Sequence, residues 1–365
     1  MDEEKAIFFT KNLFVWSDAH LRPLPWKGIK NPYFIWLSEI ILQQTRVEQG
    51  LPYYLHFIEK YPTVKDLADA AEDDVMKSWE GLGYYSRARN LHTAAKYIAY
   101  DCGNIFPNTY DNILKIKGVG VYTAAALASF AFDLPYAVVD GNVYRVLSRF
   151  FRIETPIDST EGIKKFRDLA EKLLDQTQPA RYNQAIMDFG ATHCMPKNPL
   201  CGTCNLRENC QAFLEEKVAF LPVKSKKLIK KERFFNYFIF KNEKNETWIR
   251  KRVEKDIWQN LYEFPMVESE KLLEITNENL GKIGENYFQI NESTNFKNIK
   301  ISKPYKHILT HQTVFAQFVE IEILGDDIVF KDNMLKIFEY EIKKFAFPRL
   351  IDLYCQDKNV SLSLF

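Results

Sequence analysis

The sequence lacks a long apolar run: nowhere does it reach the roughly 18 consecutive apolar residues that suggest a membrane-spanning helix. It also lacks a targeting pattern, because its first residues carry acids where a secretory or transit signal would carry bases. With 14 glycines and 15 prolines in 365 residues, it is neither collagen-like nor of low complexity. We therefore expect a globular protein that stays off membranes and in the compartment of its synthesis.

An excess of either charge is also missing. The chain has 49 basic and 48 acidic residues and a formal net charge of +1, so binding to a polyanion would depend on local clusters of charge. Cysteine is scarce as well, and six cysteines in 365 residues do not make a disulfide framework. Two of them, Cys102 and Cys355, are predicted to be buried small hydrophobic residues.

The other four cysteines fall within 17 residues, with spacers of six, two and five residues. Thiolates this close together can enclose a metal centre, either tetrahedral zinc or a [4Fe-4S] cluster. Common zinc modules use two short pairs separated by a longer spacer, so this spacing favours the cluster without excluding zinc. The candidate ligands are Cys194, Cys201, Cys204 and Cys210.

The pattern of apolar residues changes along the chain. Residues 5–220 have apolar positions at helical spacing, which predicts an all-α region. Residues 222–233 contain six basic residues and one acid, which is typical of a linker and compatible with phosphate contacts. The last third is predicted to be an α/β or α+β domain, with strands at residues 234–240, 246–250 and 314–321 and helices near residues 269–275 and 333–345.

A pair of glycines separates two helical patterns at residues 114–127. Gly118, Val119 and Gly120 lie directly before an alanine-rich run. The glycines allow a tight turn, and the first amides of the second helix would then face outward, where a phosphate oxygen can bind. This arrangement is typical of a helix-hairpin-helix motif that grips a DNA backbone, although an ordinary helix corner can contain the same residues.

Glu39 lies in an apolar helical run between Lys30 and Arg46. It is the only aspartate, glutamate, lysine, arginine or histidine within that run. Burial would disfavour its ionised form, so that it could hold a proton near neutral pH and act as a general acid. The alternative is that Glu39 lies on a solvated helix face or pairs with an arginine.

Asp140 follows an apolar stretch and precedes Gly141 and a new helical pattern, which predicts a helix N-cap. Capping alone would explain the residue. The first turn of a helix should also depress the pKa of a carboxylate, so that Asp140 could stay charged and oppose a developing cation.

In this order, residues 37–45, Gly81 to Leu91, the glycine hairpin, residues 139–143 and the cysteine loop closely resemble the adenine DNA glycosylase family within the helix-hairpin-helix glycosylase superfamily. The resemblance covers nearly all of residues 20–222. It implies a [4Fe-4S] cluster on the four cysteines and a six-helix barrel at about residues 30–135, with a cluster lobe from residues 1–29 and 136–222. The predicted fold is multi-domain: an all-α glycosylase domain over residues 1–222, a basic linker over 223–233 and an α/β Nudix-like domain over 234–365.

The resemblance also implies an activity: base-excision repair that removes adenine mispaired with 8-oxoguanine or guanine in double-stranded DNA. The adenosine must be flipped out of the stack, and the match suggests that Gln44 and Tyr84 fill the space it leaves. Glu39 would protonate N7 of the base, and Asp140 would stabilise the oxocarbenium ion, with Asn142 beside it. We expect a monomer in a bacterial cytoplasm, associated with the nucleoid, or in a nucleus if the source is eukaryotic.

One position separates two activities. Lyase-competent relatives, such as the endonuclease III family, carry a lysine at the second position after the hairpin's last glycine, where this chain has Tyr122. We therefore predict a monofunctional glycosylase. The alternatives are a bifunctional glycosylase/lyase and a DNA-binding protein without catalysis.

The C-terminal third resembles the Nudix-like domain of the same family at residues 258–265 and 306–311. It lacks the Arg-Glu-x-x-Glu-Glu pattern of hydrolytic Nudix domains, so we do not expect nucleotide hydrolysis. The family's Phe-Ser-His lesion loop is here Leu309, Thr310 and His311, which keeps the hydroxyl and the imidazole but loses an aromatic face. The resemblance implies that Thr310 and His311 contact 8-oxoguanine.

Overall fold

The structure is a computed structural model that describes residues 3–225, 230–288, 290, 296–324, 330 and 333–358. Contacts group the chain into two units, Met1–Asp69 with Thr93–Lys227 and Ala70–His92 with Leu228–Phe365. The second unit therefore contains a short piece of the helical half as well as the C-terminal part. Of the predicted linker, residues 226–229 lie outside the described residues, and a strand already begins at Lys231.

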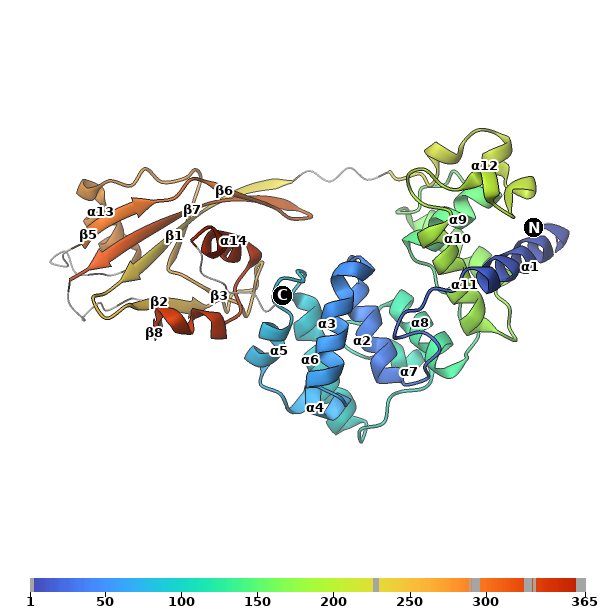
Figure 1. Ribbon diagram of the computed structural model, residues 1–365, viewed down its shortest axis with the longest axis horizontal. Coiled ribbons are helices and arrows are strands. Elements are labelled where there is room, and N and C mark those ends of the chain that lie inside the picture. The colour runs from blue at the N-terminus through green and yellow to red at the C-terminus, as the bar shows by residue number, and fades with distance from the viewer. Residues whose placement is uncertain are drawn as a thin grey trace. The chain divides into compact units, whose positions relative to one another are not determined.

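The N-terminal half is helical, as predicted (Figure 1). Its α-helices are α1 (Glu3–Ala19), α2 (Pro32–Leu42), α3 (Val47–Lys60), α4 (Val64–Asp69), α5 (Glu72–Ser78), α6 (Ser86–Lys96), α7 (Tyr110–Leu114), α8 (Val121–Phe132), α9 (Gly141–Phe151), α10 (Thr160–Leu173), α11 (Pro179–Thr192) and α12 (Gln211–Leu214). A π-helical turn at Tyr97–Asp101 continues α6, and 3₁₀ turns lie at Cys201–Thr203, Arg207–Asn209 and Val218–Phe220.

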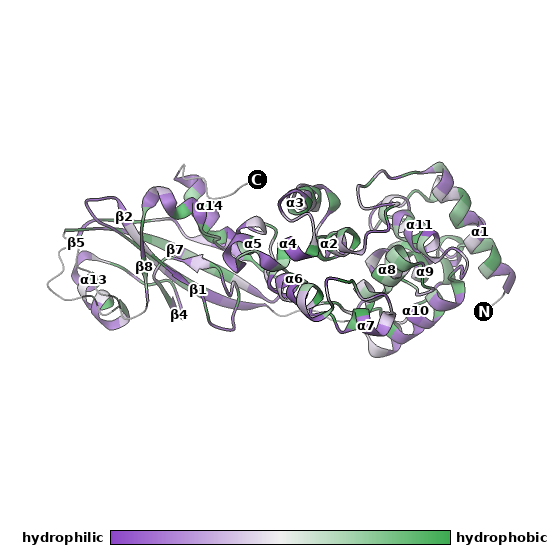
Figure 2. Cartoon of the chain, turned by 90° about the horizontal axis from the view of Figure 1, so that it is seen from below, coloured by the Kyte–Doolittle hydropathy of each residue, from purple (hydrophilic) through white to green (hydrophobic). Residues whose placement is uncertain are grey.

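Helix α1 packs against the rest of this half through one side. Helix α1 buries Phe9, Leu13 and Trp16, which are spaced three or four residues apart, against a core shared with α9, α10 and α11. In Figure 2 α1 alternates between green and purple along its length, as expected for a helix with one solvated side. Among the described residues, no helix is both long and apolar enough to cross a bilayer.

The C-terminal part contains strands, as its runs of β-branched and aromatic residues predict, and they form a mixed sheet. Strand β1 pairs in parallel with β7 and antiparallel with β2 and β4, while β3 and β8 pair with β2, and β5 and β6 pair with β7. The strands are β1 (Lys231–Lys241), β2 (Glu246–Lys251), β3 (Tyr262–Glu263), β4 (Met266–Ser269), β5 (Phe296–Ile301), β6 (Tyr305–Ile308), β7 (Gln312–Ile323) and β8 (Leu335–Phe338).

Helices lie on both faces of this sheet. Neighbouring residues of a strand point to opposite faces, and on β7 Val319 packs with the buried residues of α13 (Asn277–Ile283), whereas Phe318 stacks on Tyr354 of α14 (Arg349–Asp357) at 4.0 Å. A π-helical turn at Gly284–Phe288 follows α13, and a 3₁₀ turn at Glu339–Lys344 precedes α14.

Both predicted helices of this part were misplaced. The helix expected at residues 269–275 begins only after Thr276, whose hydroxyl caps it, because the backbone of Leu273 is held by the side chain of Asn236. The helix expected at residues 333–345 is strand β8 followed by the 3₁₀ turn, and α14 begins only after Pro348. Pairing of β8 with β2 overrides the helical periodicity of this segment.

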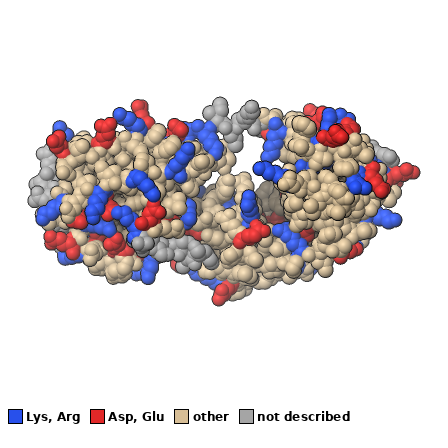
Figure 3. All heavy atoms as spheres, turned by 45° about the horizontal axis from the view of Figure 1, so that its top comes forward, with Lys and Arg blue, Asp and Glu red and all other residues tan. Residues whose placement is uncertain are grey.

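Acidic and basic side chains are interspersed over the surface seen in Figure 3. This agrees with the formal net charge of +1. On this face no bulk charge of one sign marks a binding surface, so local geometry must identify the functional site.

Candidate active site

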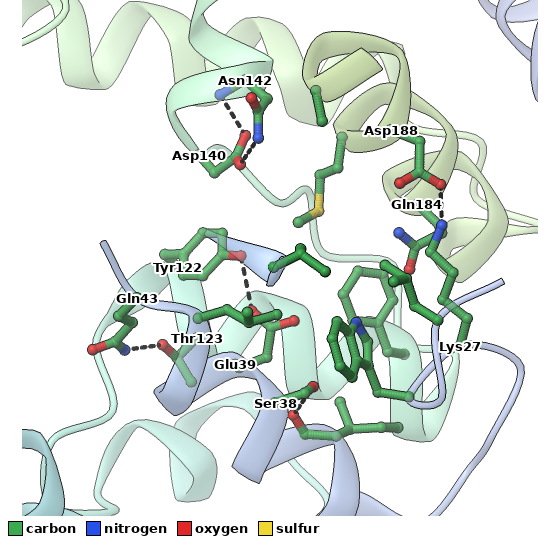
Figure 4. A pocket seen from close by; sticks show the side chains of 18 of the residues that line it. Lys27, Ser38, Glu39, Gln43, Tyr122, Thr123, Asp140, Asn142, Gln184 and Asp188 are labelled. Carbon is green, nitrogen blue, oxygen red and sulfur yellow. Dashed lines mark hydrogen bonds and ion pairs between the residues drawn. The ribbon is translucent and has the colours of Figure 1, made fainter. Parts of the chain in front are cut away.

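A cavity of about 1180 Å³ lies in the helical unit. Its wall combines the loop before α2, one side of α2, the glycine hairpin, the start of α9 and one side of α11. Figure 4 shows Glu39 and Asp140 on different walls of this pocket, with Tyr122 between them in the view. The predicted catalytic residues therefore meet in one place: Glu39, Tyr122, Asp140 and Asn142 all line the cavity.

Helix α2 places Glu39 in the wall. The Asn31 side chain caps the helix by accepting a hydrogen bond from the Tyr33 backbone, and Pro32 occupies the first turn. Most of the following side chains are apolar and buried, and Glu39 itself is only 8% exposed. The alternative of a solvated face is thus wrong for this residue.

Burial raises the pKa of Glu39 to about 7, and the nearby charge of Asp140 adds to the rise. A hydrogen bond from the hydroxyl of Tyr122 to Oε2 of Glu39, at 2.8 Å, acts in the opposite direction but does not offset the burial. A carboxyl in this state exchanges its proton near neutral pH. The hydrogen-bond partner of Glu39 is thus the neutral phenol of Tyr122 and not the arginine that the alternative interpretation of the sequence proposed.

Asp140 is the N-cap of α9, as predicted. Its Oδ1 accepts hydrogen bonds from the backbone amides of Asn142 and Val143, at 2.8 and 2.7 Å, and Oδ2 accepts from Nδ2 of Asn142 at 2.6 Å. These donors lower the pKa of Asp140, but burial is the larger effect and the net shift is upward. The expected depression of this pKa is therefore wrong in sign, because desolvation outweighs the helix terminus.

The segment that leads to Asp140 is fixed by Asn183 of α11. Its Oδ1 accepts from the Val138 amide at 3.0 Å, and its Nδ2 donates to the Tyr136 carbonyl at 2.8 Å and to Ser129 at 2.9 Å. Asn183 is 1% exposed, so these bonds are shielded from water.

Arg145 connects this carboxylate to the cysteine loop. Its guanidinium donates to Oδ1 of Asn142 at 2.9 Å and to the carbonyl oxygens of Gly190 and Cys194 at 2.6 and 2.7 Å. Since Asn142 in turn binds Asp140, the Cys194 carbonyl of the loop, Arg145, Asn142 and Asp140 form one hydrogen-bonded chain.

Polar groups from α11 and from the loop before α2 form another part of the cavity wall. Asp188 of α11 forms ion pairs with Lys27 and, at 3.6 Å, with Arg22, and burial lowers the pKa of Lys27. Gln184 and Trp26 also line the cavity. These residues come from segments about 160 positions apart, so only the fold brings them together.

The glycine hairpin forms as predicted and lies at the cavity. Gly118 has φ +80°, a conformation that glycine adopts without strain, and Gly120 is the N-cap of α8. Val119 is buried between them, whereas Val121 is 54% exposed. Gly120 supplies no side-chain cap, which leaves the start of α8 open to a ligand oxygen.

The two residues expected to fill a vacated base stack are both exposed and both have left-handed backbones. Gln44 has φ +57° at the end of α2 and lines the cavity. Tyr84 has φ +48° and is 48% exposed in the loop before α6. Its hydroxyl lies 2.9 Å from Oγ1 of Thr310, which belongs to the same unit.

Thr310 and His311 lie at the tip of the hairpin between β6 and β7, where the amide of Leu309 donates to the carbonyl of Gln312 at 2.8 Å. Both residues are exposed. An exposed hydroxyl and imidazole on a tight hairpin can reach a bound partner.

The four clustered cysteines line one small cavity of about 30 Å³ beside α9. The side chains around it include no carboxylate, and Arg149 donates to Sγ of Cys194 at 3.4 Å. Burial raises the pKa of Cys204 to about 12, so a metal would have to displace its proton on binding. Four converging sulfurs beside a cation fit an iron-sulfur cluster or zinc.

Two family models match the chain: the HhH-GPD superfamily base excision DNA repair protein over residues 37–174 and the NUDIX domain over residues 236–356. The helical part also resembles solved structures. A thermostable thymine-DNA glycosylase is 29% identical, with a TM-score of 0.54 over 58% of this chain and 98% of that one. Endonuclease III in a non-covalent DNA complex, 21% identical with a TM-score of 0.52 over 59% of this chain and 98% of that one, shares the fold.

Curated relatives span both parts of the chain. The adenine DNA glycosylase of Buchnera aphidicola subsp. Baizongia pistaciae (strain Bp) is 35% identical over 318 residues, which cover 86% of this chain and 85% of that protein. The human adenine DNA glycosylase is 39% identical over 220 residues, 58% of this chain and 40% of the human protein. The resemblance identified from the motifs is confirmed, and this chain belongs to the adenine DNA glycosylase family.

Proposed function

We propose that this protein is a monofunctional DNA glycosylase that hydrolyses the N-glycosidic bond of adenine mispaired with 8-oxoguanine, or with guanine, in double-stranded DNA. One observation carries the proposal: Glu39, with its pKa near 7, and the N-capping Asp140 face one cavity beside a glycine hairpin. A cavity of about 1180 Å³ has room for a flipped nucleoside.

Glu39 is the proton donor in this proposal. Adenine is a poor leaving group as an anion, so a proton must reach N7 as the bond to the sugar breaks. A carboxyl with a pKa of about 7 is partly protonated at neutral pH, unlike an exposed glutamate. After the transfer, ionised Glu39 can take a proton from the attacking water.

Asp140 stabilises the sugar. Departure of the base leaves an oxocarbenium ion, and a carboxylate held by three hydrogen bonds is fixed in place before that charge develops. It acts by charge or by transient covalent capture, as in glycoside hydrolysis. Tyr122, hydrogen-bonded to Glu39, sets the position of the acid.

The polar groups of α11 and of the loop before α2 would hold the extruded base. Gln184 offers an amide donor and acceptor, Trp26 an aromatic face, and the Lys27–Asp188 pair a fixed charge distribution in the wall. Water would be displaced from these groups only by a ligand with matching polar edges.

Contacts to the duplex are assigned on the basis of the family match and the local geometry. The start of α8 after Gly118, Val119 and Gly120 would bind a backbone phosphate through its amides. Gln44 and Tyr84 would occupy the space that the flipped adenosine leaves. Thr310 and His311 would contact 8-oxoguanine, with weaker stacking because Leu309 replaces an aromatic residue.

The four cysteines would hold a [4Fe-4S] cluster, whose bound form crosslinks the loop at residues 194–210. Arg145 would link the Cys194 carbonyl of this loop to Asn142, and Asn142 donates to Asp140, so that the loop would help to hold the carboxylate in place. Order in the cysteine loop is thus coupled to order at the catalytic carboxylate.

The test is single-turnover excision from an A:8-oxoguanine duplex by Glu39→Gln. Glutamine keeps the shape of the side chain but cannot give up a proton, so excision should fall at least about a hundredfold while DNA binding persists. The control is Glu59→Gln, an exposed residue of α3 outside the cavity wall, which should excise at the wild-type rate. Adenine release by Glu39→Gln near that rate would refute the proposal.

The bifunctional alternative makes a different prediction. A lyase needs an amine that forms a Schiff base with the sugar, and Tyr122 offers a phenol at the expected position. Borohydride should therefore trap little covalent enzyme–DNA adduct. The non-catalytic alternative predicts no excision by the wild-type protein in the same single-turnover assay.

A further inference from the structure

The loop between α5 and α6 has an unfavourable backbone. Gly81 and Gly83 have φ values of +87° and +77°, and Tyr84 follows with φ +48°. The left-handed region suits the glycines but not a residue with a bulky side chain, and such a conformation persists only where its surroundings enforce it. Something must therefore hold Tyr84 in place.

Arg87, in the first turn of α6, supplies this hold. Its side chain donates to the carbonyl oxygens of Gly83, at 3.1 Å, and Leu82, at 3.5 Å, and its backbone amide donates to the carbonyl of Tyr84 at 2.9 Å. The indole of Trp79 donates to the same Gly83 carbonyl at 3.0 Å. The carbonyl groups on both sides of the left-handed turn are thus bound by residues outside it.

The guanidinium of Arg87 also contacts aromatic rings. It lies 5.1 Å from the ring centroid of Trp79 and 5.4 Å from that of Tyr84, within the range of cation–π attraction. Arg87 is only 9% exposed, although arginine is rarely so buried. Both hydrogen bonds come from one nitrogen, Nη2, so a lysine ammonium could also donate to these carbonyls, but it lacks the planar face with which a guanidinium stacks on aromatic rings.

Tyr84 is consequently fixed at both ends. Arg87 lies against its ring, and Thr310 contacts its hydroxyl at 2.9 Å. About half of the side chain nevertheless remains exposed, at 48%. A large aromatic ring that is exposed but immobilised can stack on bases with little loss of side-chain entropy.

We propose that Arg87 is a positioning residue for Tyr84: it holds the ring in the exposed orientation from which it stacks on the bases next to the mispair. This rests on the proposed function, in which Tyr84 contacts DNA. Arg87 itself touches no DNA in this role. It acts through the backbone of the loop and through the Tyr84 ring.

A double-mutant cycle tests the proposal. Affinity for an A:8-oxoguanine duplex is measured for the full-length protein, Arg87→Met, Tyr84→Ala and the double variant. If stacking depends on Arg87, Arg87→Met and Tyr84→Ala should each weaken binding roughly tenfold, and the double variant should be no weaker than Tyr84→Ala. Arg87→Lys should give an intermediate affinity, because an ammonium keeps the charge and can donate to the carbonyls but lacks the planar guanidinium.

A fluorescence measurement separates positioning from general destabilisation. With 2-aminopurine beside the mispair, stacking by Tyr84 should change the emission on binding of the wild type, and Arg87→Met at saturating protein should lose that change. Arg89→Met is the matched control, since Arg89 lies on the same helix and donates to the carbonyl of Gln259 at 2.7 Å. It should keep the emission change.

The outcomes distinguish the two ideas. If Arg87→Met weakens duplex binding by the same factor whether Tyr84 or alanine stands at position 84, Arg87 does not act through Tyr84 and the positioning role is refuted. A Tyr84→Ala variant that binds and unstacks DNA like the wild type would instead refute the contact of Tyr84 with DNA in the proposed function. If Arg87→Met does not fold, Arg87→Lys with the same cycle carries the test.

Discussion

The hydroxyl of Tyr122 donates a 2.8 Å hydrogen bond to Oε2 of Glu39, across 83 positions of sequence. The bond stabilises the ionised carboxylate, while burial stabilises the neutral acid, and burial prevails. Glu39 is thereby left with a pKa of about 7, at which it can donate a proton and later accept one.

Excision should depend on pH through Glu39. A general acid must be protonated, so the single-turnover rate should fall as the pH rises through about 7, approaching a tenfold loss for each further pH unit. The rate is measured at saturating enzyme between pH 6 and about 9, with DNA affinity determined at each pH. A rate that stays constant over this range would exclude Glu39 as the acid.

Tyr122→Phe should move this profile. Loss of the phenol removes the hydrogen bond that lowers the pKa of Glu39, so the pKa should rise and the decline in rate should begin at higher pH. The measurement is the midpoint of the pH–rate curve for the two proteins. An unchanged midpoint would show that the Tyr122 hydroxyl does not set the protonation of Glu39.

Cys204→Ser should lower the iron content of the purified protein and the iron-sulfur charge-transfer absorption. Cys204 is one of four thiols around a single cavity, and serine is a poor ligand for the cluster. Cys102→Ser, at a cysteine outside that cavity, is the control and should retain both signals. Full iron content and absorption in Cys204→Ser would remove this residue from the ligand set.

His311→Ala should reduce the preference for 8-oxoguanine over guanine opposite adenine. The imidazole is exposed at the tip of the hairpin between β6 and β7, where a partner can reach it. The ratio of excision rates on the two duplexes is compared with that of Asn298→Ala, an exposed residue on β5. If the wild type, His311→Ala and Asn298→Ala all show the same ratio, His311 does not contribute to the recognition of 8-oxoguanine.

Local patterns predicted a large part of the fold. The β-branched and aromatic residues at 314–321 identified β7, and the position of Asp140 before Gly141 identified the cap of α9, because both signals depend on neighbouring residues. The two expected helices were misplaced because distant contacts decide these segments: Asn236 holds the backbone of Leu273, and β8 pairs with a strand almost 90 residues away.

The candidate site was predictable only where a motif carried it. Glu39 and Asp140 stand in recognisable segments, but the Lys27–Asp188 ion pair joins segments 161 positions apart, and no local pattern predicts that contact. The direction of the pKa shift of Asp140 could not be predicted from the sequence either. A local pattern shows the donors at a helix terminus but not the desolvation that outweighs them.

The family, the order of the two parts, the clustered thiols and the two carboxylates are encoded in short segments whose chemistry is local. Three features arise only when the chain folds: the two carboxylates share a cavity, a phenol and burial shift the pKa of Glu39 in opposite directions, and Arg87 lies against the ring of Tyr84. Burial and through-space contact arise from packing between distant segments, and no neighbouring residue encodes them.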